Sequence, residues 1–369
     1  MKEWMSRREP LIGSTLWNII KLLFRTKFRI HPRYWYRLFM TININLFLFP
    51  LRLIEKIKFS RKIRKHETSV EPIFIIGHWR TGTTYLHYLL ANDETKGYPR
   101  NVDVYTPHCS LVAPDYMKRL VEVAMPERRP MDDVELTASK PGEEEFAMAL
   151  KNKFSYYHVF IFPRRMDYFS QFLTFNKSSK RSIRVWKKHY VNYIKKISFI
   201  NGEKQLILKN PPNTGRIKLL KEIFPKAKFV YLYRNPYEIY ASSILLFQRL
   251  LPYFSLQKWD EKKIKTNILM NFIEMTEEYE RSKKTLTEDE IIEEKYEDLL
   301  ADPLSELGKI YHKLNLKGFE ESVESIQEFI KTQQQYKANK HIISKEIIED
   351  VNYNWEKFRE KYGYTKREG

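Results

Sequence analysis

The chain has 369 residues, enough for two domains or for one large α/β domain with an appendage, and enough to bury a core without covalent staples. With 43% hydrophobic and 30% charged residues, 11 Gly and 17 Pro, its composition excludes collagen-like, low-complexity and wholly disordered chains. Its single cysteine, Cys109, excludes an intrachain disulfide framework and a cysteine-based zinc cluster, so the sequence predicts a reduced, cytoplasmic protein.

The net charge of +19 indicates a phosphate, sulfate or anionic lipid partner, and this charge is unevenly distributed. Residues 1–67 hold 16 of the 65 basic residues but only 4 of the 46 acidic ones, a net +12. Two apolar runs in this segment, 10–24 and 38–54, contain interrupting Lys, Asn, Pro and Arg residues, and neither resembles a clean membrane-spanning helix. Interleaved basic and aromatic residues favour helices that lie on an anionic membrane surface. The alternative is that these helices pack on the main domain.

After residue 71 the pattern changes to short apolar runs that are followed by helical periodicity. Such alternation is typical of an α/β protein with a central parallel sheet. We predict about four to five strands, surrounded by many helices, and four of the strands are at 72–77, 205–208, 228–233 and 290–294. The predicted domains are therefore a basic helical segment at 1–67 and a main domain at 68–369, with the whole protein cytoplasmic or peripheral at the membrane.

The segment GHWRTGTT at 77–84 joins the first predicted strand to the next helix. Glycines allow backbone N–H groups to approach an anion, and the following helix presents its positive N-terminus to that anion. Gly77, Gly82 and Thr84 match the nucleotide-triphosphatase loop, but Thr83 stands where that loop has its lysine. Because that lysine reaches the β- and γ-phosphates, its absence favours a shorter anion chain, with the charge supplied by Arg80.

A second motif follows the strand at 228–233. Arg234 ends this strand, Asn235 can cap the next helix, and Pro236 suits the first helical position. A forked guanidinium and the hydroxyl of Ser242 can converge on one anion. Alone, this motif favours a structural interpretation, an arginine salt bridge and a packing face of small residues, over an anion-binding site.

Together the two motifs resemble those of the sulfotransferases that use 3′-phosphoadenosine 5′-phosphosulfate (PAPS), in the bacterial-type branch of the family. The loop form [KR]-[ST]-G-T-[ST] corresponds to residues 80–84, and R-[DN]-P with a later serine corresponds to 234–236 and Ser242. Further matches are LKNP at 208–211 and YEDL at 296–299. The resemblance implies a P-loop-like, three-layer α/β/α fold and a PAPS donor.

The resemblance also implies roles for individual residues. Arg80 and the loop amides would hold the 5′-phosphate and sulfuryl oxygens, Lys209 would reach the same region, and Arg234 and Ser242 would bind the 3′-phosphate. Tyr85 corresponds to an aromatic position beside the adenine, although a core role fits it as well. The predicted donor-binding residues are Arg80, Thr81, Gly82, Thr83, Thr84, Tyr85, Arg234, Ser242, Lys337 and Lys340.

One departure from the family concerns the catalytic base. Many soluble relatives have a histidine two residues after the lysine, and Pro211 occupies that position here. The candidates are Glu143 and Glu144, which could equally complement a helix dipole, and His78, which could equally be structural. We therefore predict Lys209, Arg80, Glu143, Glu144 and His78 as catalytic residues, without a metal.

The sequence leaves the acceptor open among a small alcohol, a glycan and a lipid, each offering a hydroxyl. Two other classes compete with the sulfotransferase: a kinase-like nucleotide enzyme of the same fold, disfavoured by the missing loop lysine, and a non-catalytic basic protein at the membrane. No motif that reads RNA or DNA is present, so a nucleic-acid partner is not expected.

Overall fold

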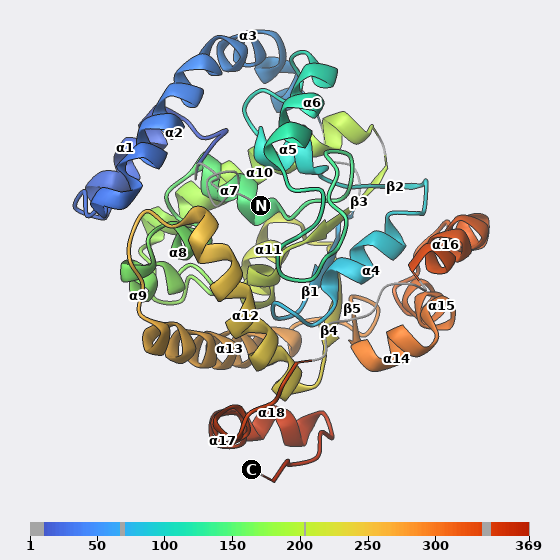
Figure 1. The fold of residues 1–369 in the computed structure, drawn as a ribbon. Helices are drawn as coiled ribbons and strands as arrows, with labels where there is room; N and C mark the ends of the chain where they lie inside the picture. The colour runs from blue at the N-terminus through green and yellow to red at the C-terminus, as the bar shows by residue number, and fades with distance from the viewer. Residues whose placement is uncertain (1–10, 67–70, 203, 334–340, 369) are drawn as a thin grey trace. The chain divides into compact units, whose positions relative to one another are not determined.

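The chain forms two compact units, and each unit is discontinuous in sequence. Figure 1 labels the helices and strands and colours the chain by residue number. The computed structural model describes residues 11–66, 71–202, 204–333 and 341–368. The first unit consists of Met1–Thr68, Pro99–Gly202 and Leu246–Ile264, and the second of Ser69–Tyr98, Glu203–Leu245 and Lys265–Gly369. All five strands that the structure describes lie in the second unit.

The second unit contains a five-stranded sheet in the order β2-β3-β1-β4-β5, in which every pairing is parallel. The strands are β1 (Ile73–Ile76), β2 (Lys96–Gly97), β3 (Gln205–Lys209), β4 (Lys228–Tyr233) and β5 (Ile291–Lys295). The predicted α/β class and parallel sheet are confirmed. Four strands lie within one residue of their predicted bounds, whereas β2 was not predicted because two residues carry no periodicity.

Both faces of the sheet are covered, because successive side chains of a strand point to opposite sides. Ile73 and Ile75 of β1 pack with Leu86 of α4 (Thr83–Leu90) and Leu307 of α15 (Pro303–Lys313). On the other face, Phe74 packs against Phe224, the C-cap residue of α11 (Ile217–Ile223), with 6.0 Å between ring centroids. The sheet is therefore the middle of three layers.

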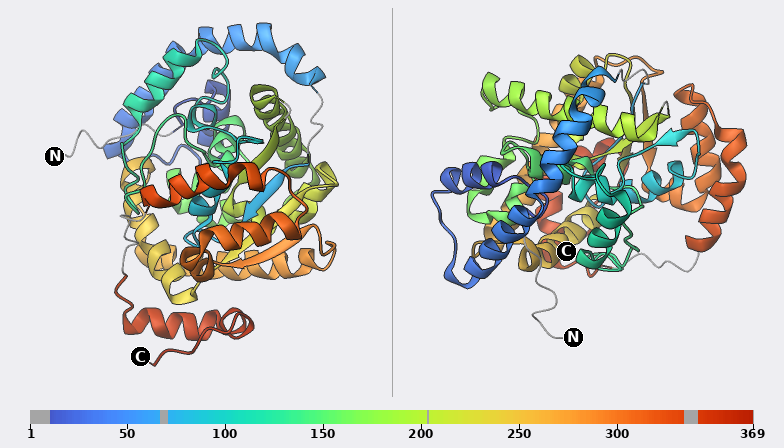
Figure 2. Two further views of the ribbon diagram at one scale, coloured as in Figure 1. Left: turned by 90° about the vertical axis from the view of Figure 1, so that its right-hand side faces the viewer. Right: turned by 90° about the horizontal axis from the view of Figure 1, so that it is seen from above.

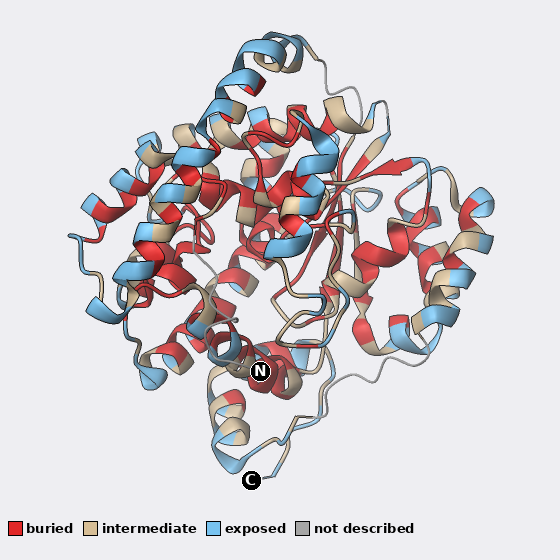
Figure 3. Cartoon of the chain, turned by 45° about the horizontal axis from the view of Figure 1, so that its top comes forward, coloured by how far each residue is buried: buried red, intermediate tan, exposed pale blue. Residues whose placement is uncertain are grey.

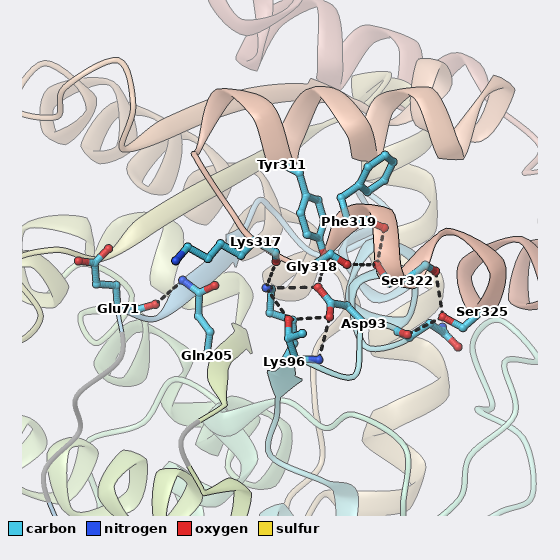
Figure 4. A network of polar contacts seen from close by, with 12 residues as sticks. Glu71, Asp93, Lys96, Gln205, Tyr311, Lys317, Gly318, Phe319, Ser322 and Ser325 are labelled. Carbon is cyan, nitrogen blue, oxygen red and sulfur yellow. Dashed lines mark hydrogen bonds and ion pairs between the residues drawn. The ribbon is translucent and has the colours of Figure 1, made fainter.

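Helices α14 (Tyr296–Ala301), α15 and α16 (Phe319–Gln333) lie next to one another in the second unit, as both views of Figure 2 show. A polar network fastens this group to the sheet edge: Lys96 Nζ lies 3.2 Å from Asp93 Oδ2, and Tyr311 donates to the same oxygen at 2.7 Å (Figure 4). The remaining helical bounds of this unit are η3 (Pro211–Gly215), α11 (Ile217–Ile223), α14 (Tyr296–Ala301), α16 (Phe319–Gln333), α17 (Lys345–Asn354) and α18 (Glu356–Lys361). Two long helices, α12 (Pro236–Phe254) and α13 (Glu261–Lys283), have residues in both units.

The described part of the first unit is helical. Its segments are α1 (Leu16–Arg25), η1 (Pro32–Tyr34), α2 (Trp35–Phe47), α3 (Phe49–Lys65), α5 (Asn101–Tyr105), α6 (Pro114–Ala124), α7 (Glu144–Lys151), α8 (His158–Ile161), η2 (Pro163–Arg165), α9 (Met166–Ser170) and α10 (Lys180–Asn201).

The N-terminal segment packs closely with later parts of this unit. Asn18 of α1 donates to the carbonyl oxygens of Ala149 and Leu150 at 3.1 and 3.2 Å, and Lys196 Nζ of α10 lies 2.6 Å from Glu55 Oε1 of α3. The segment 1–67 therefore shares its unit with 99–202 and 246–264 instead of forming one alone.

Candidate active site

The loop between β1 and α4 has a backbone conformation that requires particular residues. Gly77 and Gly82 have φ angles of +145° and +91°. A Cβ atom on Gly82 would lie 2.1 Å from the ring of Tyr296, so only glycine fits there. Arg80 has a φ of +74°, which is strained for a residue with a side chain, and such strain is concentrated at functional sites. Thr81 stabilises the loop by donating its hydroxyl to the His78 carbonyl oxygen at 2.7 Å.

Lys209 reaches the start of α4 from the neighbouring strand. Strand β3 pairs in parallel with β1, with Lys209 opposite Ile75, so both strands end at the same edge of the sheet. The buried Lys209 Nζ donates to Thr84 Oγ1 at 3.4 Å. An ammonium group is therefore held beside the first turn of α4, where the helix dipole is positive.

Arg234 and Ser242 approach the loop from β4 and α12, on the other side of β1. Arg80 Nε donates to Ser242 Oγ at 2.7 Å, and Arg234 Nη1 donates to the Arg80 carbonyl oxygen at 3.2 Å. Together with Lys209, three cationic side chains of the second unit therefore surround one loop. Such a concentration of donors suits an anion with more than one charged group.

Residues without a predicted role complete this arrangement. The Arg234 guanidinium lies 4.5 Å above the Tyr296 ring, a cation–π contact that orients it. Thr214 Oγ1 accepts from the Gly77 N–H at 2.8 Å. Tyr296 was visible in the sequence as part of the YEDL match, whereas no signal pointed to Thr214.

The start of α12 agrees with the sequence analysis. Helix α12 begins at Pro236, and Asn235 Oδ1 accepts from the N–H of Tyr237 at 3.1 Å. Glu297 Oε1 in turn accepts from the Asn235 N–H at 3.1 Å. These bonds fix the direction in which the chain leaves Arg234.

Tyr85 is half-buried against the hydrophobic core of the second unit, and its ring centroid lies 6.5 Å from that of Phe329. Burial raises the pKa of its phenol to about 12. Its place beside an adenine stays a prediction. Lys337 and Lys340 lie outside the described residues.

His78 lies among aromatic rings within the second unit. Its ring packs edge-on against Trp79 and Phe272, at centroid distances of 5.1 and 5.0 Å, and its Nδ1 lies 2.9 Å from the Trp79 carbonyl oxygen. Burial lowers the pKa of His78 from 6.5 to about 4, with the carbonyl contact opposing the shift. A neutral imidazole with so low a pKa is a weak base, which favours its structural role.

The depressed pKa of His78 predicts a pH dependence of stability. Below pH 6.5 the unfolded chain takes up a proton that folded His78 does not bind until about pH 4, so stability falls as the pH decreases through this range. We expect His78→Asn to remove about 3 kcal/mol of that fall, measured by urea unfolding across the range. His312→Asn, at an exposed site, is the control.

A 100-fold loss of turnover in His78→Asn with unchanged donor affinity would instead support its role as the base, on the scale of about 10²–10⁴ expected of general base catalysis.

Glu143 and Glu144 belong to the first unit, at the start of α7. Glu143 is the N-cap residue and accepts from the Tyr157 hydroxyl. Glu144 is fully buried and accepts from the Tyr190 hydroxyl at 3.1 Å. Neighbouring Glu145 accepts from Ser155 Oγ and the Tyr156 N–H, so it ties α7 to the following loop. The assignment of a glutamate as the base stays a prediction.

Among the residues that the structure describes, no three His, Cys, Asp or Glu side chains gather where they could hold a metal ion. The absence of a metal requirement also stays a prediction.

Comparison with known proteins identifies the family. A model described as the sulfotransferase family matches residues 72–321, which is more than half of the chain and includes the loop, Lys209, Arg234 and Ser242. This chain belongs to the sulfotransferase family. The resemblance seen in the sequence is thereby confirmed.

Individual relatives agree with this assignment. The sulfotransferase is 29% identical over 367 residues to omega-hydroxy-beta-dihydromenaquinone-9 sulfotransferase Stf3 of Mycobacterium bovis and of Mycobacterium tuberculosis, covering 99% of this chain and 94% of the relative. Among solved structures, sulfotransferase STF9 from Mycobacterium avium matches with a TM-score of 0.65 at 15% identity, covering 85% of this chain and 82% of that one. Sulfotransferase STF1 from Mycobacterium tuberculosis H37Rv matches with a TM-score of 0.60 at 18% identity, covering 89% of this chain and 84% of that one. These two likenesses confirm the P-loop-like fold.

Proposed function

We propose that this sulfotransferase moves a sulfuryl group from PAPS to an acceptor hydroxyl. The observation that carries the proposal is the convergence of Arg80, Lys209, Arg234 and Ser242 on the loop between β1 and α4. A donor with a phosphosulfate at one end and a 3′-phosphate at the other needs cationic groups at two points, and these residues supply them.

The assignment of residues to the two ends of the donor follows from their chemistry. Arg80 and the N–H groups of 81–84 would hold the 5′-phosphosulfate, since N–H groups at a helix N-terminus bind anionic oxygens. Arg234 and Ser242 would hold the 3′-phosphate. In the structure, Arg80 Nε donates to Ser242 Oγ, which is a neutral acceptor. Exchanging it for bonds to phosphate oxygens gives stronger, charge-assisted contacts.

The transfer itself requires positioning and charge stabilisation more than covalent help from the protein. When bound, PAPS supplies the sulfuryl group and a bisphosphate leaving group. Lys209 Nζ stabilises the charge that grows on the leaving oxygen, and its contact with Thr84 holds it at the start of α4. The residue that takes the proton from the acceptor hydroxyl stays the glutamate expected from the sequence, Glu143 or Glu144.

The acceptor that we propose is the hydroxyl of a lipid, with the enzyme cytoplasmic and peripheral at the membrane. Support comes from the relative Stf3, whose name specifies an omega-hydroxylated menaquinone and whose likeness extends over 99% of this chain, the basic N-terminal segment included. A glycan or a small alcohol offers the same reacting hydroxyl, but neither acceptor accounts for the basic charge of the N-terminal segment.

Calorimetry of the full-length protein with adenosine 3′,5′-bisphosphate at low salt tests the donor site. We expect saturable binding of the bisphosphate. In a separate assay, we expect transfer of radiolabelled sulfate from PAPS to a hydroxylated menaquinone analogue in detergent. ATP with magnesium is the matched control, because it has the adenosine but lacks the 3′-phosphate. A folded protein that binds neither the bisphosphate nor PAPS, or that binds ATP more tightly than either, would contradict the proposal.

A further inference from the structure

The buried side chains of helices α2 and α3 are mostly polar, and many of their large apolar side chains are exposed, the reverse of a helix on a soluble domain. Three of the four buried residues of α2 are polar, namely Arg37, Thr41 and Asn45. Both buried residues of α3, Arg52 and Glu55, are charged. The exposed residues of the two helices therefore include large apolar side chains and, on α3, basic ones; Figure 3 shows the chain coloured by burial.

The exposed apolar residues are concentrated in this part of the chain. Of 19 large hydrophobic side chains exposed in the described residues, 13 lie between residues 17 and 57. Phe39, Phe47 and Ile57 are 63%, 66% and 72% exposed. We name this set the N-terminal apolar face: Trp17, Ile20, Phe24, Phe28, Trp35, Tyr36, Phe39, Leu46, Phe47, Phe49, Leu53, Ile54 and Ile57. So many exposed apolar side chains on adjoining helices indicate a binding surface.

The turn after α1 adds a strained pair of residues to this face. Lys27 and Phe28 both have positive φ angles, +56° and +52°, which non-glycine residues rarely adopt. Phe28 is half exposed, and its ring packs edge-on against exposed Phe24 at 5.0 Å. Two aromatic rings therefore lie in contact with each other at the surface of the first unit, at a turn with left-handed backbone.

The charges around the N-terminal apolar face have one sign. From residue 11 to residue 66 the sequence contains one acidic residue, Glu55, and that residue is buried against Lys196. The exposed charged residues of this stretch are all basic: Lys21, Arg25, Lys27, Arg29, Arg33, Lys56, Lys58, Arg61, Lys62, Arg64 and Lys65. A second copy of the chain meeting this face with its own would bring these like charges together, whereas anionic lipid headgroups neutralise them.

The helices are anchored along their length, which favours an orientation in the membrane plane. Arg37 of α2 donates to the carbonyl oxygens of Pro252 and Ser255 at 2.6 and 3.1 Å, and Glu55 Oε1 of α3 accepts from Lys196 Nζ of α10 at 2.6 Å. No single helix in the described ranges has the length and apolarity to cross a bilayer; α2 and α3 meet those criteria only as a pair bent by 43°. A pair fastened to the first unit at both helices cannot leave it to cross.

We propose that the N-terminal apolar face docks this protein on an anionic lipid bilayer, with α1, α2 and α3 lying in the interface. Phe, Trp and Leu side chains enter the headgroup region, and the basic residues pair with lipid phosphates. Docking and sulfuryl transfer are separate properties, and each can fail without the other.

Flotation of the full-length protein with vesicles tests the docking. We expect binding to phosphatidylcholine vesicles that contain about 30 mol% phosphatidylglycerol, little binding to phosphatidylcholine alone, and weakening as salt rises above about 0.1 M. The double variant Phe39→Ser/Phe47→Ser should reduce vesicle partitioning by about tenfold or more. The double variant Lys58→Glu/Lys62→Glu should abolish the preference for phosphatidylglycerol.

The matched control is Tyr116→Ser/Val123→Ser, which removes exposed apolar side chains from α6 and should leave partitioning unchanged. Thermal melts confirm that each variant is folded, and bisphosphate calorimetry shows whether the donor site is intact independently of docking. Wild-type protein that does not float, or apolar variants that float as wild type, would overturn the proposal. A wild-type protein that is dimeric, with apolar variants that are monomeric, would also overturn it. The same holds for vesicle-bound protein that resists alkaline extraction as a membrane-spanning protein does.

Discussion

Replacement of Lys209 by methionine is expected to lower the turnover number of sulfuryl transfer by about 100- to 1,000-fold, the range observed when one donor to a developing oxyanion is removed. Methionine fills a similar volume in the buried position at the end of β3, so it removes the ammonium group without opening a cavity. The affinity for adenosine 3′,5′-bisphosphate should change little, because Lys209 is assigned to charge that appears during transfer. Single-turnover kinetics with PAPS measures the rate, and calorimetry measures the affinity.

The control for this experiment is Lys204→Ala, which removes an exposed lysine just before the same strand. Both variants should melt within a few degrees of the wild type. A Lys209→Met protein that is folded and turns over at the wild-type rate would exclude the assigned role. Equal losses of bisphosphate affinity and of turnover would indicate a ground-state contact instead.

The second large effect is expected for Arg234→Ala, which should weaken binding of adenosine 3′,5′-bisphosphate by about 100-fold. Two charge-assisted hydrogen bonds to one phosphate contribute about 3 kcal/mol, and their loss corresponds to that change in the dissociation constant. Arg234→Lys keeps the charge but loses the forked geometry and much of the contact with Tyr296, so an intermediate loss of about tenfold is expected. Calorimetry with the bisphosphate and with adenosine 5′-monophosphate measures both.

The comparison of ligands makes this experiment specific. Arg234→Ala should bind adenosine 5′-monophosphate as the wild type does, since that ligand has no 3′-phosphate. Arg249→Ala, at an exposed position on α12, serves as the control for loss of a positive charge. If Arg234→Ala weakened the binding of both ligands equally, the arginine would not bind the 3′-phosphate. It would instead support the loop through its bond to the Arg80 carbonyl oxygen.

Several features of the fold were predictable because they depend on local pattern. The continuous apolar run at 73–76 is typical of a buried strand, and Asn235 followed by Pro236 is typical of a helix start, and both are observed. The residue spacing of the loop at 77–84 likewise identified an anion-binding turn before any contact was known. These predictions needed no information from distant parts of the chain.

The strand order could not be predicted in this way, and it is the reason that the candidate site exists. Lys209 and Arg234 lie 25 positions apart and follow different strands, and both meet the same loop because β1 lies between β3 and β4. The short strand β2 depends similarly on contacts with β3 and on the network around Asp93. Such pairings join residues far apart in the chain, and no local pattern records them.

Which way a side chain faces was the other property that local pattern left open. Apolar runs at 10–24 and 38–54 would look the same if their large residues pointed into a core. Long-range bonds from Arg37 and Glu55 hold these two polar side chains of α2 and α3 inward, while Phe39, Phe47 and Phe49 are exposed. Composition and spacing thus define the elements and the chemistry of this sequence, while partners distant in the chain define the direction of each face, since burial depends on the whole fold and not on neighbouring residues.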